Sequence, residues 1–161
     1  MKCVARILVP SLMLLAPSCA RPDPLGAPKI ALDQTSCAEC GMIVSDERYA
    51  CASIVRIDDR RTEPRVFDDV NCLVLHEVTG SSPPEVLARW VHDKDSRRWL
   101  AAESAHFVWA KELNTPMMSH IAAFASSDSA DAFARESEGQ RMTFAQVRWL
   151  YTPEHLRGPE P

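Results

Sequence analysis

Residues 65–80, RVFDDVNCLVLHEVTG, contain a short strand that leads directly into a capped helix. Val and Phe near the start of the stretch are strong strand formers. Asp68 or Asp69 can cap the helix that follows, because a carboxylate accepts hydrogen bonds from the free amides of a first turn. Gly80 is a stop signal for that helix. The apolar positions that recur at helical spacing are Val70, Leu73, Val74 and Val78.

The residues on either side of this stretch predict further strands. Residues 49–57, YACASIVRI, mix β-formers with partial alternation, and the polar run at 58–61 is typical of a hairpin turn. Residues 88–93 predict a third strand, with Trp90 and His92 on one face. Residues 36–95 are therefore expected to form one strand–strand–helix–strand (ββαβ) unit.

The second half of the chain repeats this order. Strands are expected at 106–110, 121–125 and 140–143, and a helix capped within 126–128 is expected to end at Gly139. A closing helix over 144–151 is ended by Pro153. Phe67 and Phe124 each end the second strand before a capped helix. The sequence thus predicts an α+β fold of two small ββαβ repeats packed side by side, the second covering residues 96–152.

The N-terminus has the pattern of a secretory signal. A positive start is followed by an apolar stretch too short to span a bilayer, so residues 1–18 are expected to be removed. The sequence LAPSC ending at Cys19 resembles a bacterial lipobox, which predicts lipidation of Cys19. Residues 19–35 are Pro-rich and are expected to form a tether, and 153–161 a flexible tail. These features predict a periplasmic lipoprotein held at the membrane by its lipid anchor.

Composition excludes several classes of function. The 161-residue chain has a net charge of −4 and no run of Lys and Arg, which argues against nucleic-acid binding. It contains no Ser/His/Asp set, no paired acid and base carboxylates, and no phosphate-binding loop. We therefore expect no enzymatic activity.

The most informative motif is Cys37-Ala38-Glu39-Cys40-Gly41-Met42, which places three sulfur side chains within six residues. Thiolates and thioethers are soft donors that select Cu(I), with zinc and iron–sulfur clusters as competitors. Gly41 lets the backbone fold back, so that Cys40 and Met42 can face one ion. We expect Cys40, which adjoins Gly41 and Met42, to matter more than Cys37.

A second loop, residues 114–120, includes Pro116-Met117-Met118-Ser119-His120. Met is usually a core residue, and consecutive exposed Met side chains are costly without a purpose. Because the two loops occupy similar positions in the two halves, Met117, Met118 and His120 are candidate ligands beside the first motif. Cys51 in a strand and Cys72 in a helix are expected to pack in the core.

Together these motifs resemble the NosL family of nitrous oxide reductase accessory lipoproteins. The resemblance is carried by CAECGM at 37–42, by VFDD at 66–69 with Cys72-Leu73, and by Thr115-Pro116-Met117 followed by Ala123-Phe124. It implies a copper chaperone that binds Cu(I) and delivers it for the copper centres of nitrous oxide reductase. It also implies a membrane ABC-type assembly complex as a partner, and it matches Cys40, Met42 and Met117 to family motifs.

The same residues allow three other interpretations. Cys37 and Cys40 can form a thiol–disulfide redox pair, although such pairs usually begin a helix that follows a strand. They can also belong to a structural zinc module, which needs four nitrogen or sulfur ligands and can draw on Cys72 and a His. Disulfides between Cys37 and Cys40, or between Cys51 and Cys72, make a purely structural lipoprotein the third alternative.

Overall fold

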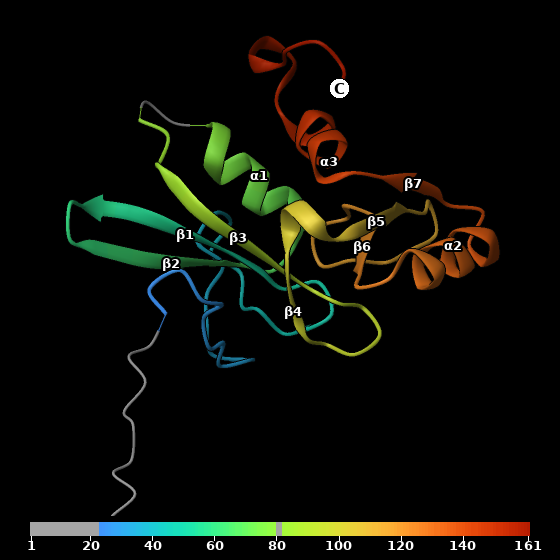
Figure 1. Cartoon of the computed structure of the whole chain (residues 1–161), viewed down its shortest axis with the longest axis horizontal. Coiled ribbons are helices and arrows are strands. Elements are labelled where there is room, and N and C mark those ends of the chain that lie inside the picture. Colours follow the sequence, from blue (N-terminus) through green and yellow to red (C-terminus); the bar gives the residue numbers. More distant parts are fainter. Residues whose placement is uncertain (1–22, 80–81) are drawn as a thin grey trace, which may run out of the picture.

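The structure is a computed structural model that describes residues 23–79 and 82–161. Two antiparallel sheets and three α-helices make up this part of the chain (Figure 1). The strands are β1 (Cys51–Asp58), β2 (Arg61–Phe67), β3 (Val86–His92), β4 (Trp99–Ala101), β5 (His106–Trp109), β6 (Ile121–Phe124) and β7 (Gln140–Met142). The helices are α1 (Val70–Val78), α2 (Ser127–Glu136) and α3 (Phe144–Tyr151), with short 3-10 turns at Ala102–Ser104 and Glu154–Leu156.

The first sheet has the strand order β2-β1-β3-β4. Its central strand, β1, is buried from Cys51 to Val55 because β2 and β3 pair with it on either side. Helix α1 connects β2 to β3 and packs against β1 and β2 (Figure 1). The end of β2 and the start of α1 therefore lie at the same end of this sheet.

The second sheet has the order β6-β5-β7 and lies beside the first (Figure 1). A parallel bridge between Asp93 and Ala123 joins the two sheets, and the Lys94 amide donates to the Ala123 carbonyl at 2.8 Å. Helices α1 and α3 are also in contact. The two sheets thus share a common core.

The mixed α and β architecture predicted from the sequence is confirmed, and the expected helices and strands are found close to their predicted positions. In each sheet the strand that comes first in the sequence lies between the next two strands: β1 lies between β2 and β3, and β5 lies between β6 and β7. The sequence did not predict β4, which pairs with the last three residues of β3, Trp90 to His92. Its three residues are too few to show a periodic pattern.

Side-chain caps explain where the helices begin. Asp69, one of the two predicted candidates, caps α1 by accepting from the Val70 amide. Ser126 caps α2, and Thr143 caps α3 in a capping box with Gln146. These local bonds depend only on neighbouring residues, which is why the sequence located the helix starts well.

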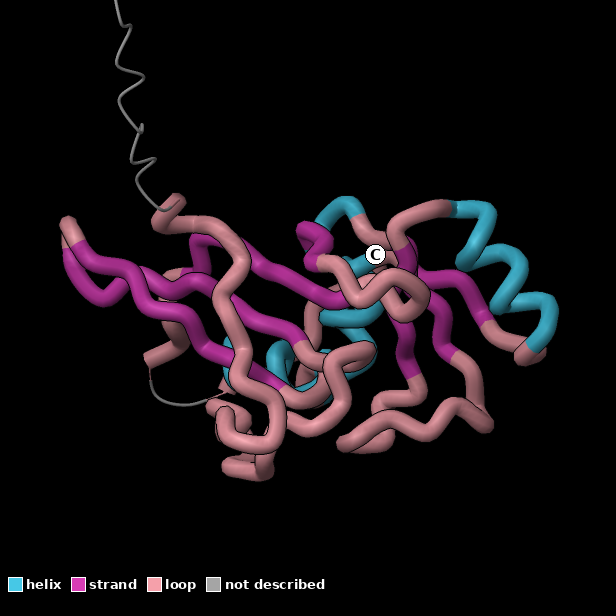
Figure 2. Tube along the Cα trace, turned by 90° about the horizontal axis from the view of Figure 1, so that it is seen from below, coloured by secondary structure: helices cyan, strands magenta, loops and turns pink. Residues whose placement is uncertain are grey.

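The described part of the predicted tether is docked on the protein. Residues 23–35 begin where the grey N-terminal trace ends, and they run across the strands of the first sheet (Figure 2). Ile30 and Leu32 pack on the core, and the Trp90 indole donates to the Leu25 carbonyl at 3.0 Å. The apolar side chains that follow Pro28 thus favour contact with the core over a free tether.

The tail after α3 is likewise folded back. The Trp149 indole donates to the Gly158 carbonyl at 2.9 Å, and the Arg157 guanidinium lies over the Trp149 ring. The predicted signal segment, residues 1–18, and the lipidation site at Cys19 lie outside the described residues. Within 23–79 and 82–161, no helix is long and apolar enough to cross a membrane.

Candidate metal centre

The CxxCGM loop, residues 36–43, is a tight hairpin closed by its own backbone. The Cys37 amide donates to the Met42 carbonyl at 2.7 Å, and the Gly41 amide donates to the Cys37 carbonyl at 3.0 Å. Gly41 has φ of 76°, a left-handed conformation that glycine adopts without a Cβ penalty. The Ala38 amide also donates to the Val66 carbonyl, which fixes the loop against the end of β2.

The start of α1 brings two more donor groups to this loop. Asp68 lies between the end of β2 and the capping residue Asp69, and Cys72 is in the first turn of the helix. The side chains of Asp68 and Cys72 both turn toward the loop. A hydrogen-bonded pair between His76 on α1 and Glu39 in the loop, 3.1 Å long, holds helix and loop together.

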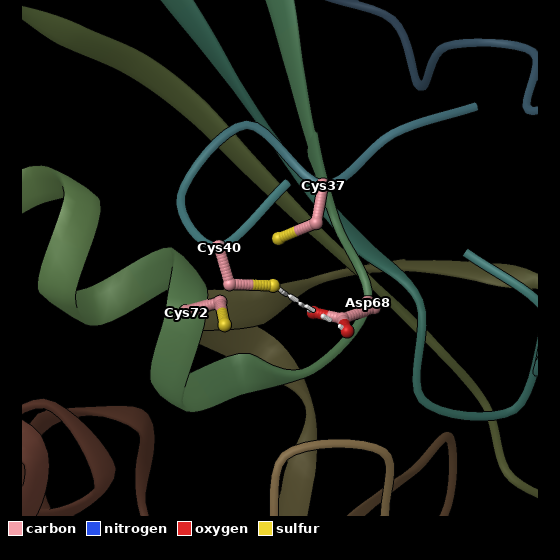
Figure 3. A group of neighbouring side chains, drawn as sticks. All are labelled: Cys37, Cys40, Asp68 and Cys72. Atoms are coloured by element: carbon pink, nitrogen blue, oxygen red, sulfur yellow. Dashed lines mark hydrogen bonds between the residues drawn. The ribbon is translucent and has the colours of Figure 1, made fainter. Parts of the chain in front are cut away.

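The side chains of Cys37, Cys40, Asp68 and Cys72 form one group, here called the thiol cluster (Figure 3). Their sulfur and carboxylate oxygen atoms all lie within 4.8 Å of one another. Cys40 is exposed, whereas the other three are buried. The Cys40 thiol lies 3.7 Å from each oxygen of the Asp68 carboxylate.

The surroundings of Cys37 favour its thiolate. The neighbouring Cys72 thiol has the largest effect on its pKa, and the nearby backbone amides of Cys40, Asp68 and Glu39 act in the same direction. Together they lower the pKa of Cys37 to about 4, although burial acts in the opposite direction. The nearby N-terminus of α1 also favours a thiolate there.

The other members of the cluster are shifted the opposite way. The neighbouring Cys37 sulfur, together with burial, raises the pKa of Cys72 far above the usual range and keeps its proton in place. Partial burial and the neighbouring Cys37 raise the pKa of Cys40. Burial, followed by the interaction with Cys37, raises the pKa of Asp68 to about 6. The free cluster thus holds one thiolate and two protonated thiols that a metal can replace.

The geometry of the cluster fits a thiophilic metal ion. A metal–sulfur bond is about 2.3 Å long, so two sulfurs on one ion are at most about 4.6 Å apart. For a linear two-sulfur site the spread of 4.8 Å needs to contract by only a few tenths of an ångström. In a tetrahedral four-ligand site neighbouring ligand atoms are about 3.8 Å apart, so the group must contract by about 1 Å. Three thiols and one carboxylate offer soft ligands for copper or a four-ligand set for zinc.

The other residues predicted to bind metal do not belong to this group of atoms. The Met42 side chain is 53% exposed. Met117 is half-buried against the core, whereas Met118 is 60% exposed. His120 uses its Nδ1 atom in a 2.8 Å hydrogen bond with the Leu113 carbonyl.

The two loops nevertheless approach each other through the start of α1. Asp69 accepts a hydrogen bond from the Met117 amide at 3.0 Å. The Asn71 side-chain amide donates to the Met117 carbonyl at 2.8 Å. Met117 is therefore held beside the segment that carries Asp68 and Cys72.

The sequence interpretation assigned neither Asp68 nor Cys72 to the copper site, although its zinc alternative included Cys72. It treated Asp68 as a candidate cap and placed Cys72 in the core, where cysteines are common. The spacing of Asp68 and Cys72 on a predicted helix was the available signal. Cys51 is buried in β1, and burial raises its pKa. All four cysteines among the described residues are free, so the structure contains neither of the alternative disulfides.

A small protein that gathers thiols from a loop and a helix start belongs to the class of thiolate metal-binding proteins. A model of the NosL family matches residues 29–152, and the chain belongs to this family. Among solved structures, it is similar to the copper chaperone NosL from Shewanella denitrificans. That match has a TM-score of 0.62 and 19% identity, and it covers 76% of this chain and 95% of the other. No curated protein matches the chain significantly.

Proposed function

We propose that this protein is a copper chaperone that binds Cu(I) at the thiol cluster. The observation that carries the proposal is the convergence of three cysteine sulfurs from two separate segments. A copper chaperone of the same fold, the NosL of Shewanella denitrificans, supports it. Cu(I) is the substrate here, taken up and passed on unchanged, so the proposal includes no enzymatic step.

The different exposure of the cysteines indicates how copper is exchanged. Cys37 carries the thiolate and is only 3% exposed, so it provides affinity from inside. Cys40 is exposed and lies at the surface end of the cluster. An acceptor can therefore replace Cys40 first, form a mixed complex, and withdraw the ion.

Competition between metals tests this proposal. We expect the reduced protein to bind one Cu(I) far more tightly than Zn(II) in titrations against chelators for each metal. Four-ligand zinc binding that equals or exceeds Cu(I) binding would instead favour the structural zinc module. That alternative has one specific observation in its favour, since Asp68 supplies a fourth ligand of the type that zinc accepts.

The variant Asp68→Asn separates the two metals. A carboxylate is a hard donor, so its loss should weaken Zn(II) by at least about tenfold and leave Cu(I) within about threefold. Equal losses for both metals would mean that Asp68 acts on the cluster as a whole. The redox alternative is less favoured, because the Cys37 sulfur that would attack a disulfide is buried.

We further propose that the protein delivers copper during assembly of nitrous oxide reductase and is held in the periplasm by a lipid on Cys19. Its partner would be nitrous oxide reductase or its membrane ABC-type assembly complex. Cells that lack the chain should make nitrous oxide reductase with less copper, and the parent gene, but not Cys37→Ser, should restore it. Cys19→Ala should release the protein from membranes and leave Cu(I) binding unchanged.

Retention of the Cys19→Ala protein on membranes would reveal a different anchor. Normal copper loading in cells that lack the chain would remove the delivery proposal. Neither outcome affects Cu(I) binding by the purified protein, which is measured separately.

A further inference from the structure

The five residues 68–72 present side chains to two different partners. Asp68 and Cys72 belong to the thiol cluster. Asp69 and Asn71, which lie between them in the sequence, form hydrogen bonds to the second loop. The same short segment at the start of α1 therefore contacts the metal centre and the loop that carries Met117.

Asp69 is the centre of the contact with the second loop. Its carboxylate is 1% exposed. It accepts from the Met117 amide at 3.0 Å, the Thr115 hydroxyl at 2.6 Å and the Ser119 hydroxyl at 2.5 Å. It also caps its own helix through the Val70 amide at 2.7 Å. A buried carboxylate with this many donors fixes the position of the loop firmly.

Asn71 completes the contact from the other side of the Met117 backbone. Its Nδ2 atom donates to the Met117 carbonyl, and its Oδ1 atom accepts from the Cys72 amide, each at 2.8 Å. One side chain thus joins Met117 directly to a residue of the cluster. Both backbone polar groups of Met117 are therefore hydrogen-bonded, the amide to Asp69 and the carbonyl to Asn71.

We propose that Asp69 and Asn71 are positioning residues that hold Met117 at the thiol cluster, so that its thioether adds to the metal-binding site. The inference rests on the proposed Cu(I) binding and assigns neither residue as a metal ligand. A thioether needs no deprotonation and leaves readily, which suits a donor that must release its ion.

Asn71→Asp is the sharpest test, because it replaces only the side-chain NH2 group, which donates to the Met117 carbonyl, with an oxygen atom. The new oxygen faces the Met117 carbonyl, while the bond to the Cys72 amide can persist. We expect Cu(I) affinity to fall by about tenfold. In a Met117→Ala background the same change should alter affinity by less than about twofold, because the residue acts through Met117.

Asp93→Asn is the matched control. Asp93 is also a buried aspartate that ties a loop, since it accepts from the Ser96 hydroxyl and the Ala125 amide, but it does not contact the second loop. Asp69→Asn should lower affinity as Asn71→Asp does, because either orientation of the new amide opposes a backbone N–H. Asp93→Asn should destabilise the fold and leave affinity unchanged.

The measurements are Cu(I) competition titrations and amide hydrogen exchange on the purified protein as cells produce it from the full sequence. The Met117 amide should be protected in the parent and in Asp93→Asn, and should exchange faster in Asn71→Asp and Asp69→Asn. Parent-like affinity in Asn71→Asp would overturn the inference, as would an equal loss in the Met117→Ala background. A parent that binds no Cu(I) would remove the proposed function and the inference together, so the two failures are distinguishable.

Discussion

The CxxCGM loop and the second loop meet the same segment, residues 68–72, in different ways. The CxxCGM loop is closed by its own backbone and turns two cysteine sulfurs inward. The second loop depends on the side chains of Asp69 and Asn71 for its position, and it leaves Met118 at the surface. The comparison indicates that the CxxCGM loop provides the centre of the proposed metal site, and that the second loop lies at its edge and is held there by other side chains.

Loss of a cysteine from the cluster should have the largest effect. Cys72→Ala should weaken Cu(I) binding by more than about a hundredfold, beyond the loss typical of a supporting group. Competition with a Cu(I) chelator measures it. Cys51→Ala is the matched control, because Cys51 is equally buried but lies outside the cluster. It should cost about 1 kcal/mol of stability and leave affinity unchanged. Parent-like affinity in Cys72→Ala would restore its interpretation as a core residue.

The thiolate of Cys37 should make the metal-free protein more stable as the pH rises. The pKa of Cys37 is lowered to about 4, so the unfolded chain binds one proton more than the native state above that pH. This contribution is fully present above the unfolded pKa and is lost as the pH falls through the folded one. Asp68 acts the opposite way, because its pKa is raised to about 6 and its contribution is lost as the pH rises through that value.

Above the range in which Asp68 and His92 titrate, the effect of Cys37 should dominate the slope. Between about pH 7 and about pH 8, the unfolding free energy should rise by up to about 1.4 kcal/mol per pH unit. Urea denaturation under reducing conditions measures the slope. The Cys37→Ser variant should lose it. A parent and variant with equal slopes would show that the charge lies elsewhere in the cluster.

Gly41→Ala should have a moderate effect that is specific to the CxxCGM loop. The added Cβ meets no atom within 4 Å, so the cost comes from the left-handed backbone alone. We expect a loss of about 1–2 kcal/mol in thermal or urea unfolding, and weaker Cu(I) binding. Gly158→Ala is a suitable control, because its Cβ also meets open space and its φ is not in the left-handed region. Equal stability of the two variants would contradict the strained turn.

Met118→Ala should have the smallest effect. Met118 is 60% exposed, and its amide bonds to Thr115 within its own loop. We expect Cu(I) affinity to change by less than about twofold in the same competition titration, compared with a larger loss for Met117→Ala. A larger loss for Met118→Ala would show that the ion is reached from the surface side of the second loop.

Local patterns in the sequence account for most of the fold. Alternation predicted β1, helical spacing with a cap predicted α1, and Ser126 and Gly139 correctly bracketed α2. The described part of the Pro-rich segment was less predictable. Its contacts with the sheet depend on Ile30 and Leu32, whose partners are far away in the chain.

The sequence by itself determined that Cys37 and Cys40 lie in a tight loop, because Gly41 and the short spacing act locally. Only the tertiary structure decided that Cys72 joins them. The direction of a side chain at a helix start depends on what packs against that face, and here β2 and the CxxCGM loop do so together. The same packing turned Asp68 toward the sulfurs and Asp69 toward the second loop. The sequence alone does not show which of two adjacent aspartates faces which loop.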